Sequence, residues 1–141
     1  MSNIKSKDTY KKYKAKKKKI EREAIKLWKH IVLERFPLCV ACKERKATHP
    51  HHYFYKSSYG FLKLDSNNGI GLCPSCHFVL HHQDPKKITH NIKKNMSKKW
   101  LKDLEHKAFK ERPQGTYKTL TWLEEQHNIL KHKKKPTRKS G

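Results

Sequence analysis

Acidic residues are scarce in this chain of 141 residues, and cations are abundant. Only 12 aspartates and glutamates oppose 35 lysines and arginines, so the formal net charge is +23. A charge of this size repels itself unless a polyanion neutralises it. Nucleic acid is the favoured partner, because cationic side chains release the counterions condensed on its phosphates. An acidic membrane surface is the competing partner.

Apolar residues are also few. They make up 34% of the sequence, the mean hydropathy is -1.07, and no apolar run is long enough to span a bilayer. The N-terminus, M-S-N-I-K-S-K-D-T-Y-K-K, lacks the apolar core of a signal peptide, so we expect a cytoplasmic protein. A chain of this composition buries a small core and needs a further cross-link, for example a metal ion.

Changes in composition divide the chain into five segments. A basic arm at 1–19 is expected to be flexible, or to become ordered on nucleic acid. An amphipathic helix at 20–36 supports the domain, because its apolar residues recur at steps of four, three and four. Residues 37–84 form the core, 85–131 a basic helical extension and 132–141 a basic tail.

Capping residues predict where the helices of the extension begin. Asp84 followed by Pro85 is a start signal, because an N-cap precedes a proline in the first turn. Ser97 is predicted to cap the next helix. Thr121 and Glu124 have the spacing of a capping box at the start of the last one.

The four cysteines form two C-x-x-C pairs, Cys39/Cys42 and Cys73/Cys76. In a reducing compartment this pattern favours metal binding over disulfides, and zinc takes four thiolates tetrahedrally. The segment 43–72 between the pairs is longer than the usual spacing of about 15–20 residues. We therefore predict a structural zinc ion on the four cysteines, with an insert between the two knuckles. The alternative is four core cysteines without a metal.

Histidines gather in and after this insert. His77 and His81 stand four apart in a predicted helix, so both imidazoles leave one helical face, as two ligands of one metal do. His51 and His52 are adjacent in a predicted strand and face opposite ways. One can bind the ion while the other takes a proton from water, which favours metal-assisted phosphodiester hydrolysis. The alternatives are ordinary surface or core histidines, or a second structural zinc.

Three motifs together resemble the HNH, or ββα-metal, endonucleases: H-H-Y at 51–53, Asn68, and C-P-S-C-H at 73–77. The resemblance covers residues 39–82. It implies an α+β fold in which a small zinc-stapled ββα-metal core is flanked by helices. It also implies a DNA endonuclease.

The resemblance assigns roles residue by residue. It implies that the general base is His52, that Asn68 fixes the loop carrying the base, and that the catalytic ion is bound by His51, His77 and His81. Three histidines suit zinc, nickel or manganese better than magnesium, which prefers oxygen ligands.

The order of the segments after the H-Y motif is more loosely similar to that of phage recombination endonucleases of the NinG/Rap type. This similarity implies a phage-like nuclease that acts on branched or recombining DNA. Single-stranded DNA is a further candidate partner, and a phage-infected bacterium is the candidate setting. Four cations flank the predicted base and are candidate phosphate contacts: Arg45, Lys46, Lys56 and Lys63. Two alternatives stay open: a zinc-stapled nucleic-acid-binding protein without catalysis, and a nuclease that acts on RNA.

Overall fold

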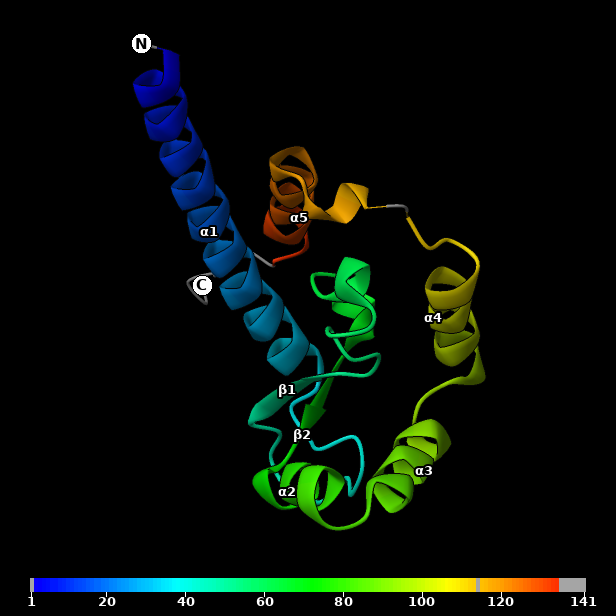
Figure 1. The fold of residues 1–141 in the computed structure, drawn as a ribbon. Coiled ribbons are helices and arrows are strands. Elements are labelled where there is room, and N and C mark those ends of the chain that lie inside the picture. The colour runs from blue at the N-terminus through cyan, green and yellow to red at the C-terminus, as the bar shows by residue number, and fades with distance from the viewer. Residues whose placement is uncertain (1, 114, 135–141) are drawn as a thin grey trace, which may run out of the picture.

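The computed structural model describes residues 2–113 and 115–134 (Figure 1). Over this part of the chain it contains five α-helices, three 3-10 helices and one two-stranded antiparallel sheet. Their bounds are α1 Ser2–Arg35, β1 His49–His52, η1 Gly60–Leu62, η2 Ser66–Asn68, β2 Gly69–Leu72, α2 Pro74–His82, α3 Pro85–Asn95, α4 Lys98–Phe109, η3 Thr116–Lys118 and α5 Leu120–Lys133. The predicted α+β class is confirmed, with helix in the majority. Most of the predicted tail, residues 135–141, lies outside the described part of the chain.

Helix α1 is longer than the sequence analysis predicted. It begins at Ser2, so the predicted helix start near Ile20 is wrong. The segment before Ile20 contains no proline or glycine and is rich in lysine, which is a good helix former. Lys14 also lies over the ring of Tyr10, one helical turn away. In Figure 1 the first turns of α1 project beyond the other elements.

The β1–β2 hairpin directs its two adjacent histidines to different sides. In the antiparallel register His51 is opposite Ile70, and His52 is opposite Gly69. Opposed residues share a face of the sheet, so each histidine lies on the side of its partner. Ile70 packs in the core around the cysteines. Gly69 lies so close to α1 that a Cβ there would stand 2.2 Å from Val32, which explains the glycine.

Three groups of buried side chains hold the helices in place. The first surrounds the cysteines and includes Ile88 and Ile92 of α3. The second joins α1 to α5 and consists of Ala24, Trp28, Ile31, Val32, Leu64, Leu123 and Leu130. The third lies beneath α4. The last helix of the predicted extension therefore returns to pack on α1. No helix among the described residues has both the length and the apolar character needed to cross a membrane.

Two of the three predicted helix caps are confirmed. The side chains of Asp84 and Ser97 each accept a hydrogen bond from the backbone N–H three residues further on, at 3.1 and 3.0 Å. The third prediction, a cap at Thr121, is wrong. The side chain of Thr119 caps α5 instead and accepts the backbone N–H three residues further on at 3.2 Å. Thr121 lies inside the first turn, since Leu120 is already helical. Both threonines are residues of a type favoured at the N-cap, and the helix begins after the earlier one.

Candidate metal centres

The four cysteines converge as predicted. One sulfur each from Cys39, Cys42, Cys73 and Cys76 lies within 4.8 Å of all the others. The Sγ atoms of Cys42 and Cys73 are 3.9 Å apart. Two sulfurs bound tetrahedrally to zinc at about 2.3 Å would stand about 3.8 Å apart, so this spacing fits the ion. The group could therefore hold a structural zinc.

Backbone hydrogen bonds shape the first knuckle. The Cys39 N–H donates to the Arg45 carbonyl at 2.8 Å and closes the turn. The last residue of α3, Asn95, donates from its side-chain Nδ2 to the carbonyls of Val40 at 2.8 Å and Ala41 at 3.2 Å. Helix α3 thus braces the knuckle from outside the cysteine motifs.

The second knuckle forms the start of α2. Cys73 is the N-cap of this helix, and its Sγ accepts the Cys76 N–H at 3.4 Å. Burial opposes ionisation of Cys73, but the Cys76 N–H and the Arg45 guanidinium lower the pKa of its thiol to about 6. The thiolate is the form that binds metal. Arg45, predicted as a phosphate contact, therefore lies beside the cysteine group, and Lys46 is exposed next to it.

Three histidines form a second convergent group. One ring nitrogen each from His51, His77 and His81 lies within 4.8 Å of the other two. His51 comes from β1, and the other two leave one face of α2 a turn apart. The ring centroid of His51 is 6.1 Å from that of His77 and 5.4 Å from that of His81. The predicted convergence is confirmed, and the group could hold a metal ion.

The electrostatics favour neutral imidazoles at two members of this group, His51 and His77. Burial, followed by repulsion from His81, His77 and His52, lowers the pKa of His51 to about 4. Burial, His81 and His49 lower the pKa of His77 in the same direction. Neutral imidazole is the form that binds metals. His52, which contributes to this effect on His51, is the next residue along β1.

His52 is held in one orientation on the α1 side of the hairpin. Its ring stacks on the indole of Trp28, with centroids 3.9 Å apart and planes 6° apart. Its Nε2 lies 2.8 Å from the carbonyl oxygen of Lys63. A carbonyl can only accept, so Nε2 carries the proton and Nδ1 keeps its lone pair. Burial is the main cause that lowers the pKa of His52, which leaves the ring neutral near pH 7.

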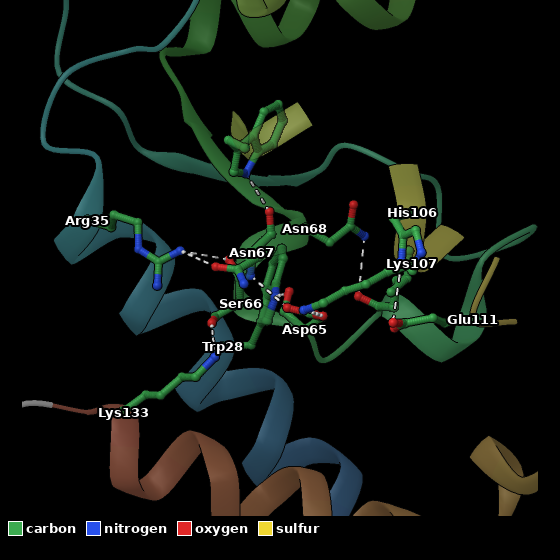
Figure 2. A network of polar contacts seen from close by, with 12 residues as sticks. Trp28, Arg35, Asp65, Ser66, Asn67, Asn68, His106, Lys107, Glu111 and Lys133 are labelled. Atoms are coloured by element: carbon green, nitrogen blue, oxygen red, sulfur yellow. Dashed lines mark hydrogen bonds and ion pairs between the residues drawn. The ribbon is translucent and has the colours of Figure 1, made fainter. Parts of the chain in front are cut away.

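The short helix η2 joins distant parts of the chain. Four successive carbonyls, those of residues 65–68, each accept one hydrogen bond from another element. The donors are Trp28 Nε1 at 2.8 Å, Arg35 at 3.2 Å, Trp100 Nε1 at 2.8 Å and the Tyr53 N–H at 2.9 Å. Figure 2 shows this network, with Lys107 on the carboxylate of Asp65 and Lys133 on the hydroxyl of Ser66. Helices α1, α4 and α5 are thereby tied to the segment that carries Asn68.

Asn68 is fully buried and fixes the loop that follows the two histidines. Its Oδ1 accepts the Phe54 N–H at 2.8 Å, and its Nδ2 donates to the carbonyls of Phe54 at 3.0 Å and Leu62 at 3.3 Å. The loop between these contacts leads directly to Lys63, whose carbonyl holds His52. Asn68 therefore acts on the orientation of His52 through the loop.

Replacing Asn68 with alanine is expected to destabilise the protein by about 2–4 kcal/mol, because one buried N–H and two carbonyls lose their partner. Urea unfolding monitored by tryptophan fluorescence measures the change. The matched control is Asn67→Ala, which removes an exposed amide with a 3.4 Å contact to Arg35 and should cost less than about 1 kcal/mol. Equal losses in the two variants would contradict the assigned role.

Several contacts of the site have no recognisable signal in the sequence. Trp28, on the apolar side of the helix predicted at 20–36, lies both in the core and against His52. Lys63, expected at a phosphate, forms an ion pair with Glu21 of α1 at 3.0 Å. Lys56 is exposed and lines a groove beside His52. An indole on an apolar helical stripe looks like any core residue, so only the folded chain identifies its partner.

Both predicted groups of side chains are thus assembled, and His52 and Asn68 make separate contacts of their own. Comparisons of the chain with protein-family models, with curated proteins and with solved structures find no significant match.

Proposed function

We propose that this protein is a metal-dependent endonuclease of the HNH type that hydrolyses phosphodiester bonds in DNA. The observation that carries the proposal is the position of His52. A fourth imidazole, with Nε2 engaged and Nδ1 available, directly follows that of His51 along β1, and His51 is one of three imidazoles that converge on one point. The order strand β1, strand β2, helix α2 around these residues supports the same assignment.

The residues divide the chemical work. A divalent ion held by His51, His77 and His81 would neutralise the scissile phosphate and stabilise the leaving oxygen; zinc, nickel, manganese and magnesium are the candidates. His52 accepts a proton from the attacking water at Nδ1, while the carbonyl of Lys63 keeps the ring oriented.

The competing proposal is a zinc-stapled protein that binds nucleic acid without cutting it. The cysteine group and the positive charge would serve both proteins equally well. A binding protein, however, has no use for three convergent imidazoles beside a fourth that is oriented by stacking and by a backbone carbonyl. This arrangement is why we favour the nuclease.

The test is incubation of plasmid DNA with the zinc-loaded protein and Mg, Mn, Ni or Zn. His81→Ala is expected to lose at least about 100-fold in cleavage rate, because it removes a metal ligand. His82→Ala is the matched control: it is the next residue on α2, equally exposed, and lies outside the convergent group. Intact plasmid under every ion would favour the binding protein. Equal cutting by the two variants would contradict the assigned metal site, and the same assay on RNA and branched DNA identifies the substrate.

A further inference from the structure

A large basic groove lies on the α1 side of the hairpin and reaches His52. Its volume is about 970 Å³, and its walls come from α1, from the loop between β1 and η1, and from η3 with the start of α5. Six cations and one carboxylate line it: Lys17, Lys29, Lys56, Lys63, Arg112, Lys118 and Glu21. Most of these residues lie outside the segment 39–82 that contains both metal groups.

The charge of the groove is nearly all uncompensated. Its one carboxylate, Glu21, is already paired with Lys63. Across the residues that the structure describes, none of the other five groove cations forms an ion pair with a carboxylate. His52 lines the same groove as Lys29 and Lys56. An anion in the groove would therefore pass close to His52.

The second side of the groove is held in place by Arg112. Its guanidinium donates to the Ser58 carbonyl at 2.7 Å and lies 5.4 Å from the centroid of the Tyr59 ring. Tyr117 of η3 approaches the same loop, because a Cβ at Gly60 would stand 3.1 Å from its ring. The loop beside His52 is thus fastened to the segment between α4 and α5.

The length of the groove suits a run of several nucleotides. Lys17, Glu21, Ile25 and Lys29 line it at every fourth residue of α1, a stripe about 18 Å long at 1.5 Å per residue. At 3.4 Å per phosphate, the axial spacing along one strand of a duplex, this stripe spans about five phosphates.

We propose that this groove binds a single strand of DNA through its phosphates and leads it past His52. The idea that the strand is cut there rests on the proposed function, whereas binding in the groove does not depend on it. Tyr117, which lines the groove, offers a ring on which an unpaired base can stack.

The test compares two triple variants with the same change in net charge. The groove variant is Lys29→Gln, Lys56→Gln and Lys118→Gln, three exposed lysines on the three walls. The control is Lys26→Gln, Lys94→Gln and Lys110→Gln, three exposed lysines outside the groove. Binding of fluorescein-labelled oligothymidylate of about 12 nucleotides to the zinc-loaded protein is followed by anisotropy across a salt series.

In the groove variant, the plot of the logarithm of the association constant against the logarithm of the salt concentration is expected to be less steep by about 2, because three phosphate contacts are lost. Binding at 0.1 M salt should be weaker by about 100-fold for the same reason. The control should stay within about 3-fold of the parent protein. Similar losses in the two triple variants would overturn the proposal, and so would a parent protein that binds the duplex as tightly as the single strand. Cleavage is scored separately: binding through the groove without cutting refutes only the nuclease, and cutting with unchanged binding by the groove variant refutes only the groove.

Discussion

Replacing Cys73 with serine is expected to unfold the core around the cysteines and to abolish zinc binding. Cys73 has two roles, since its sulfur belongs to the four-cysteine group and also caps α2. Structural zinc contributes about 10–16 kcal/mol to the folding of small modules. This is comparable to the total stability of most domains, about 5–15 kcal/mol.

The measurements are metal content by atomic absorption and thermal unfolding by circular dichroism. Ser75→Ala is the matched control, because Ser75 is an exposed residue between the two cysteines of the same knuckle. It should leave zinc content at one ion for the cysteine group and the unfolding temperature near that of the parent protein. A Cys73→Ser protein that is zinc-free yet melts like the parent would show that the four cysteines form ordinary core.

Removing the imidazole of His52 is expected to lower the single-turnover cleavage rate by about 10²–10⁴-fold, the usual contribution of a positioned general base. His52 lies outside the group of three convergent histidines, so His52→Ala should keep its metal. This combination of lost cleavage and retained metal separates a proton acceptor from a ligand. The measurement pairs plasmid nicking at saturating ion with the metal content of the same sample.

The control for this variant is His90→Ala, since His90 is exposed on α3 and belongs to neither metal group. It should cut at the parent rate. Two outcomes would contradict the assignment of His52 as general base. In the first, the His52→Ala variant cuts as fast as His90→Ala; in the second, it loses its metal together with its activity.

Parts of both metal groups could be predicted from the sequence, because the residues of each pair lie close together in the chain. Cysteines three apart share a knuckle, and histidines four apart share a helical face whatever the rest of the chain does. Alternation along a strand likewise separates His51 from His52. Each of these patterns depends on neighbouring residues alone, and all three are present in the structure.

Contacts between distant segments were decided only by the tertiary structure. The stacking of Trp28 on His52 and the hydrogen bonds of Asn68 join segments that no local pattern relates. The start of α1 at Ser2 follows from the helix propensity of lysine. The same lysine-rich composition is equally typical of a flexible arm, so the sequence did not distinguish the two. The basic groove depends on how α1, α5 and a loop meet, so its lysines could not be told from other surface lysines in advance. Local spacing thus indicated which residues pair within each knuckle and on the helix, and the packing of remote elements determined which way each side chain is held and what approaches it.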